Sequence, residues 1–217
     1  MLDHLRIELE KKAKPQNKDP MEAYMKQKFS FLGVKSPERR EASKAILMEL
    51  RNEKDIQWDF VFNCFEQEER EFHYIACDYL RKVQRKLTHD DLANVKSLIC
   101  THSWWDTVDA LAIEVGAIGH KHPEIRQSVL PEWSKGENLW LRRVSLIHQL
   151  RYKEKTDLEF LASSIQSNLR SREFFINKAI GWALRSYSAV NPRWVIQFCD
   201  SHDLHSLSKK EALRKIN

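Results

Sequence analysis

The sequence predicts an all-α fold, a right-handed α-solenoid of HEAT-like helical hairpin repeats, and three observations predict it. Glycine is rare, with 5 residues in a chain of 217, and segments with the strict alternation of half-buried strands are absent. Helix starts are well marked, and aromatic residues recur at the spacing of a helical repeat. We therefore expect a single domain over residues 1–217, in which one helix from each hairpin lines a concave face.

Four segments carry the residue pattern of a helix start. Two of them pair a capping side chain with a proline in the first turn, and two have the Ser/Thr-x-x-acid spacing of a capping box. In chain order these starts are Ser36, Thr88, Asn191 and Ser208. Residues 14–20 and 151–157 are polar, and we expect them to be connections between helices.

The repeat is carried by aromatic residues at positions 72, 105, 140 and 175, which stand 33, 35 and 35 residues apart. Four positions after the aromatic, three repeats have a small or apolar residue, namely Ala76, Val144 and Ala179. The repeat that begins at Trp105 has Asp109 there instead. A buried, unpaired carboxylate is costly, so its presence at a packing position indicates a function. The alternative is that Asp109 caps a turn or pairs with a nearby arginine.

Composition limits the classes to which the protein can belong. Hydrophobic residues make up 42% and charged residues 31%, as in globular domains, and no apolar run approaches the roughly 18 residues of a membrane span. The N-terminal segment lacks the apolar core of a signal peptide, and the four cysteines form no CxxC pair, so we expect a cytoplasmic protein with free thiols. The net charge of +5 permits a polyanionic partner.

Three segments resemble the AlkD-type DNA glycosylases of the HEAT-like-repeat family. They are SWWDTVD at 103–109, NLWLRRVSLIHQLRYK at 138–153 and EFFINKAIGWALRSYSAVNP at 173–192, and residues 20–40 and 207–216 extend the resemblance over nearly the whole chain. The resemblance implies hydrolysis of the N-glycosidic bond of cationic alkylated purines, such as 3-methyladenine and 7-methylguanine, in double-stranded DNA. We expect a monomer that needs no metal or other cofactor and has no membrane partner.

The resemblance also assigns the site residues. The family's catalytic aspartate falls on Asp109, and its two lesion-flanking tryptophans fall on Trp105 and Trp182. The accompanying arginine falls on Arg143, which we expect to hold a phosphate of the lesion strand and to help keep Asp109 ionised. A tyrosine near the DNA falls on Tyr24. The resemblance further implies that the lesion stays stacked in the duplex, whereas most glycosylases flip the base into a pocket.

These residue types suit that chemistry. Alkylation at N3 or N7 makes the purine cationic, so the base departs as a neutral molecule while positive charge develops on the deoxyribose. A fixed carboxylate can stabilise that charge and orient the attacking water. Indole faces attract cations by about 0.5–2 kcal/mol each, which favours cationic lesions over ordinary bases.

A set of basic and hydroxyl side chains is expected to bind the DNA phosphates. Its members lie in or beside the helices that we expect to line the concave face, and binding should weaken steeply with salt. Besides Tyr24, the set comprises Lys35, Ser36, Arg40, Arg142, Arg151, Lys153, Lys178 and Arg185.

Two other functions are open at this point. A non-catalytic relative that binds distorted or branched DNA would be expected to lack Asp109 or one of the two flanking tryptophans, and all three are present. A protein-interaction scaffold would lack the whole Asp-Trp-Arg-Trp set. The remaining tryptophans are assigned to packing, and they are Trp58, Trp104, Trp133, Trp140 and Trp194.

Overall fold

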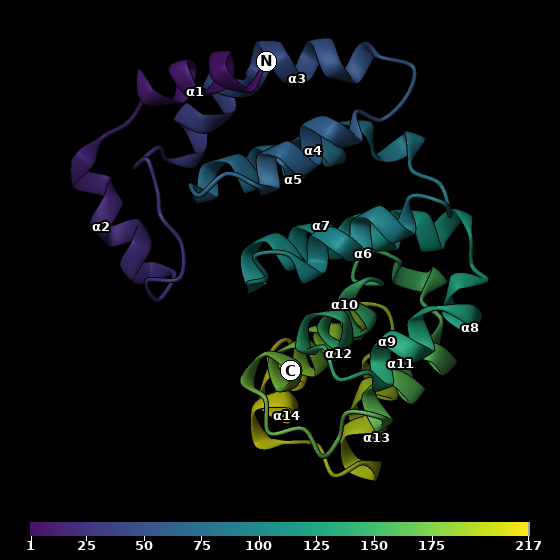
Figure 1. The fold of residues 1–217 in the computed structure, drawn as a ribbon. Helices are drawn as coiled ribbons and strands as arrows, with labels where there is room; N and C mark the ends of the chain where they lie inside the picture. The colour runs from purple at the N-terminus through teal and green to yellow at the C-terminus, as the bar shows by residue number, and fades with distance from the viewer. Residues whose placement is uncertain (217) are drawn as a thin grey trace. The chain divides into compact units, whose positions relative to one another are not determined.

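The chain is built from helices joined by short connections (Figure 1), as a computed structural model that describes residues 1–216 shows. Residues 1–216 contain no strand, apart from one isolated bridge between Ser30 and Glu69. The all-α prediction is therefore confirmed. None of the helices in this range is both long and apolar enough to cross a bilayer.

The helices group into two compact units, which are described separately. Unit 1 covers Met1–Leu87, and unit 2 begins at Thr88. The prediction of a single domain stays a prediction, as do the right-handed superhelix and the concave face.

Unit 1 contains five α-helices and one 3-10 turn. Helix α3 packs against α1 and α5, and α4 and α5 form a hairpin. The bounds are α1 Leu2–Glu10, α2 Pro15–Tyr24, α3 Ser36–Asn52, α4 Trp58–Phe65, α5 Arg70–Val83 and the 3-10 turn η1 Gln84–Lys86.

Unit 2 stacks its helices so that α10 packs between α7 and α12, and α12 packs in turn against α14 (Figure 1). The bounds of the first five helices are α6 Leu92–Cys100, α7 Trp105–Lys121, α8 Ile125–Ser128, α9 Leu130–Lys135 and α10 Leu139–Ile147. The bounds of the rest are η2 Lys153–Lys155, α11 Leu158–Gln166, α12 Phe174–Ser188, α13 Pro192–Ser201 and α14 Ser206–Leu213.

The aromatic repeat marks the same place in each of four helices. Its four aromatic residues all stand within the first three residues of a helix, in α5, α7, α10 and α12. Four positions further on, Ala76, Val144 and Ala179 are completely buried, whereas the Asp109 side chain keeps 17% of its surface exposed. The sequence pattern therefore identified a true packing position, and Asp109 does depart from it.

One of the two expected connections is wrong. Residues 14–20 were predicted to be a connection, but most of them form the start of α2, because Pro15 occupies the first turn, where its missing N–H costs nothing. The Asn17 side chain anchors this helix by donating to the carbonyl of Gly33 at 3.1 Å. The other polar connection, 151–157, holds only the short turn η2, as expected.

The four predicted helix starts have mixed outcomes. Asn191 caps α13 as predicted, since its side chain accepts from the Trp194 N–H at 3.0 Å. Thr88 does not start a helix, because α6 begins at Leu92. Its N–H donates to the Asp91 carboxylate at 2.7 Å, which is one of the two hydrogen bonds of a capping box.

The starts assigned to Ser36 and Ser208 are displaced. Ser36 is the first residue of α3 itself, and Lys35 is the N-cap. Ser208 lies inside α14, where its hydroxyl donates to the carbonyl of Asn177 on α12 at 2.8 Å. The sequence pattern predicts that Ser208 caps its own helix, but its hydroxyl makes a contact between two helices instead.

Gly181 permits the closest helix contact in unit 2. A Cβ atom at this position of α12 would lie 2.5 Å from the Cβ of Glu211 and 2.9 Å from the carbonyl oxygen of Ser208, both on α14. Because glycine has a hydrogen atom in place of a Cβ, α12 and α14 can pack this closely. Trp182 is the next residue along α12.

We predict that Gly181→Ala will force α14 away from α12 and lower the free energy of unfolding by about 1–3 kcal/mol, the usual cost of overpacking. Urea denaturation followed by circular dichroism measures the change. Gly136→Ala is the matched control, because Gly136 is exposed, has a φ of −68°, which alanine readily adopts, and would place a Cβ no closer than 3.1 Å to any neighbour, the Glu132 carbonyl oxygen. The control should change stability by less than about 1 kcal/mol. Equal stabilities for Gly181→Ala and the unaltered protein would contradict the close-contact role.

Candidate functional site

The centre of the candidate site is an ion pair between α7 and α10. Asp109 lies one turn after Trp105, so both side chains project from the same face of α7. Arg143 of α10 donates from Nε to Oδ1 of Asp109 at 2.7 Å and from Nη2 to Oδ2 at 2.8 Å. This two-pronged geometry fixes both the position and the rotation of the carboxylate.

Arg143 also ties the pair to a third helix. Its Nη1 donates to the backbone carbonyl of Phe175, near the start of α12, at 2.6 Å, and its guanidinium lies 5.8 Å from the centre of the Phe175 ring. The rings of Trp104, Trp140 and Phe175 form an aromatic cluster with centre-to-centre distances of 5.6, 5.0 and 5.1 Å. The starts of α7, α10 and α12 are therefore joined by apolar and polar contacts at once.

The two members of the ion pair differ in exposure. The Arg143 side chain is only 4% exposed, whereas the Asp109 side chain is 17% exposed. Burial raises the pKa of Asp109 above its ordinary value, the hydrogen bonds from Arg143 oppose that rise, and the charge of Asp106 adds to it. The arrangement holds a carboxylate from the protein side and leaves part of it accessible.

This geometry favours one of the two roles predicted for Arg143. Three of its N–H groups are directed to Asp109 and Phe175, and its side chain is buried. The guanidinium is therefore placed to orient the carboxylate. Binding of a lesion-strand phosphate by Arg143 stays a prediction.

The two tryptophans of the predicted site lie on the helices that flank α10. Trp105 opens α7 and Trp182 stands in α12, seven residues after Phe175 and therefore on the same face of that helix. Both indoles are half-buried. A half-buried ring is held by packing on one side and can still meet a ligand on the other.

The predicted phosphate-binding residues of unit 2 fall into two groups. Arg151 and Lys153 are exposed. Three others are engaged within the protein: Arg142 donates from Nε to the Asn168 side chain at 2.8 Å, and Lys178 and Arg185 both bind Glu211. The sequence did not indicate these partners, and for the engaged residues a contact with DNA stays a prediction.

The predicted residues of unit 1 are all exposed, and Tyr24 has 70% of its surface accessible. They comprise Tyr24, Lys35, Ser36 and Arg40. Because they belong to the other unit, their association with Asp109 stays a prediction.

Sequence reasoning missed the residue that shapes the loop before α3. Glu71 is completely buried, and its carboxylate accepts from the backbone N–H groups of Leu32, Gly33 and Val34 at 3.1, 3.0 and 3.0 Å. Gly33 has a φ of +86°, a conformation that favours glycine, and it lets the chain turn towards Lys35. An acidic residue inside an apolar helical segment was the available signal.

Five tryptophans were assigned to packing. Trp133 is buried, and the other four are half-buried against further aromatic rings. Trp104 and Trp140 belong to the aromatic cluster beside the ion pair, so they support the site without being proposed to bind substrate.

Comparisons with known proteins agree on one family. The family model described as DNA alkylation repair enzyme matches residues 5–216. The chain is similar to a solved structure described as a predicted DNA alkylation repair enzyme from Enterococcus faecalis, with 32% identity and a TM-score of 0.89. That likeness covers 94% of this chain and 97% of the other. No curated protein matches the chain.

We predict that Arg143→Ala will destabilise the protein by about 3–5 kcal/mol, because it leaves a largely buried carboxylate without its partner. Arg143→Lys should lose less, since it keeps the charge but not the two-pronged contact. Denaturant unfolding measures both. Arg142→Ala is the control, because the neighbouring guanidinium makes one hydrogen bond to Asn168 and is not part of the ion pair. An Arg143→Ala protein no less stable than the control would contradict the central role of the pair.

Proposed function

We propose, from the premise that this chain belongs to the DNA alkylation repair enzyme family, that it is a monofunctional DNA glycosylase. The proposed reaction is hydrolysis of the N-glycosidic bond of cationic alkylated purines, such as 3-methyladenine and 7-methylguanine, in duplex DNA. The observation that carries the proposal is the Asp109 carboxylate, fixed by two hydrogen bonds from Arg143 yet partly exposed.

The reaction needs little help with the leaving group. When the bond between C1′ and the purine nitrogen breaks, its electron pair goes to the purine, and the alkylated ring becomes neutral. The deoxyribose is left with a positive charge shared by C1′ and the ring oxygen. Water forms the new bond to C1′ and loses one proton, and the products are the free base and an abasic site.

Asp109 is proposed to act on the sugar. A carboxylate near C1′ stabilises the developing positive charge, and it can also accept the proton of the attacking water. Arg143 holds the carboxylate in one orientation, so no reorganisation is needed as the charge develops. Its positive charge also favours the ionised form that the reaction requires.

Trp105 and Trp182 are proposed to face the cationic nucleotide. An indole face attracts a cation by about 0.5–2 kcal/mol, and it attracts a neutral base less. Recognition of this kind selects for charge and leaves the identity of the alkyl group open. It acts from the sugar side, so the lesion can stay stacked in the duplex, and the half-buried state of both indoles supports such an open site.

We predict that Asp109→Asn will lower the single-turnover rate of 7-methylguanine release by about 10²–10⁴-fold, the usual contribution of a positioned carboxylate, while DNA affinity changes little. Chromatography of the free base and a DNA-binding titration measure the two quantities. Asp106→Asn removes a carboxylate from the same turn of α7 and should keep wild-type release at neutral pH. Equal release by the Asp109→Asn protein and the unaltered one would refute the role of Asp109.

We predict an acid limb in the pH profile of base release, because only ionised Asp109 can stabilise the sugar cation. Burial raises the pKa of Asp109, so activity should fall at a higher pH than an exposed aspartate would give. The charge of Asp106 also raises that pKa, so Asp106→Asn should move the limb to lower pH. Single-turnover rates across pH measure the limb, and a shift to higher pH in Asp106→Asn would contradict the assignment.

A non-catalytic DNA-binding protein is the rival function. It would give a salt-dependent complex with methylated duplex DNA and release no base. The same release assay on the unaltered protein therefore separates the enzyme from the binder.

A further inference from the structure

A basic hollow borders Trp182 on the side of the C-terminal helix. It encloses about 740 Å³ and lies wholly within unit 2. Its walls come from α12 and from the residues that follow α14, and they include Trp182, Arg185, Ser186, Ser188, Arg214 and Lys215. None of the functions assigned so far uses Arg214 or Lys215.

The walls of this hollow are held rigidly. Gly181 lets α14 approach α12 to the limit of van der Waals contact, and the Ser208 hydroxyl donates to the Asn177 carbonyl at 2.8 Å. Glu211 adds a second anchor, because its carboxylate, 11% exposed, binds Lys178 at 2.7 Å and also Arg185. Arg214 follows directly after α14, so its backbone position is fixed by the same packing.

The charges around the hollow do not balance. Three of the residues that line the hollow are basic, Arg185, Arg214 and Lys215, and none of the lining residues is acidic. Glu211 is shared by Lys178 and Arg185. Within residues 1–216, the side chains of Arg214 and Lys215 make no hydrogen bond or hydrogen-bonded ion pair. Two cations are thus available beside an indole ring, whereas the hydroxyls of Ser186 and Ser188 already donate to backbone carbonyls at 2.8 Å each.

We propose that this hollow binds a backbone phosphate of the DNA, next to the nucleotide that Trp182 faces, with Arg214 and Lys215 as the contacting cations. The proposal rests on the proposed function, since it deepens the DNA site of which Trp182 is part. A phosphodiester carries one negative charge and several acceptor oxygens, which suit an arginine and a lysine. Glu211 acts as a positioning residue, because its carboxylate binds Arg185, one of the lining residues, and makes no hydrogen bond to the side chain of Arg214 or Lys215.

The test is the salt dependence of binding to unmodified duplex DNA. The slope of log K against log salt is negative, and each lost phosphate contact should make it shallower by about 1. Arg214→Ala and Lys215→Ala should therefore each reduce the magnitude of the slope by about 1, and the double variant by about 2. Arg214→Lys keeps the charge and should retain the wild-type slope. Circular dichroism confirms that each variant is folded before the slope is read.

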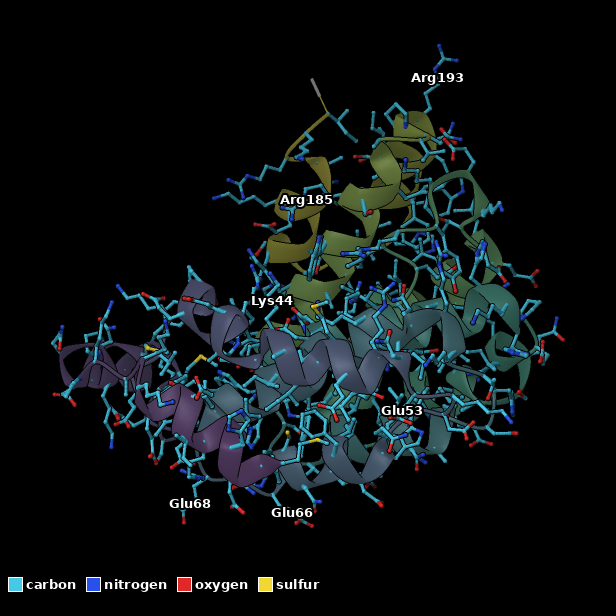
Figure 2. All side chains as sticks on the ribbon, turned by 90° about the horizontal axis from the view of Figure 1, so that it is seen from above. Lys44, Glu53, Glu66, Glu68, Arg185 and Arg193 are labelled. Atoms are coloured by element: carbon cyan, nitrogen blue, oxygen red, sulfur yellow. The ribbon has the colours of Figure 1, made fainter. Side chains whose placement is uncertain are left out.

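Two matched controls remove a positive charge elsewhere in unit 2. Lys210 is exposed on α14 itself, and Arg193 is exposed on α13, where its side chain extends outward (Figure 2). Neither lines the hollow. Lys210→Ala and Arg193→Ala should keep the wild-type slope. If the Arg214 and Lys215 variants lose no more than these controls, the proposal is overturned.

Two further arms separate the possible ligands and the two proposals. Inorganic phosphate, added at constant ionic strength, should not displace the duplex, and displacement at millimolar concentrations would mean a site for free phosphate instead. The slope is measured without a lesion, so it does not depend on catalysis. Absence of base release with the expected loss of slope would refute only the glycosylase, whereas base release with an unchanged slope would refute only the phosphate site.

Discussion

The ion pair between Asp109 and Arg143 is the interaction on which the rest of the site depends. A buried ion pair rarely adds stability, because desolvation of two charges offsets their attraction unless the geometry is good and the remaining donors are satisfied. Here Arg143 meets both conditions, with two hydrogen bonds to one carboxylate and a third to the Phe175 carbonyl. The pair therefore joins three helices and fixes a carboxylate that keeps part of its surface open.

The repeat explains why these residues meet. Asp109 and Arg143 are 34 residues apart, close to the 33 to 35 residues of the aromatic period, so stacked hairpins bring them to the same level. Other contacts follow the same spacing: Lys178 and Glu211 are 33 residues apart, and the Tyr152 hydroxyl donates to the Gly116 carbonyl 36 residues away. One sequence period thus generates both the packing of unit 2 and its polar contacts.

Sequence reasoning was strongest where local periodicity decides the structure. The helical class could be predicted because it depends on residues a few turns apart, and the repeat register and the unusual place of Asp109 because the aromatic residues recur every 33 to 35 positions. The alternative for Asp109, pairing with an arginine, also holds, since the structural pairing is what fixes the proposed catalytic group.

Prediction failed where a side chain forms its hydrogen bond with a residue of a helix distant in the sequence. Ser208 and Glu211 have the spacing of a capping box, yet Ser208 binds Asn177 and Glu211 binds Lys178 and Arg185. The local pattern offers those side chains a nearby N–H, and tertiary packing offers them a better partner. The same effect hid the buried role of Glu71 and the engagement of three cations assigned to DNA.

The family likeness and the fixed carboxylate lead to one central claim, that this protein cleaves the bond between a cationic purine and its sugar. The most direct measurement is the release of free methylated purine from methylated duplex DNA by the unaltered protein, under single-turnover conditions. The account predicts free 7-methylguanine and an equal number of abasic sites. A stable complex in which every methylated base stays attached would contradict it.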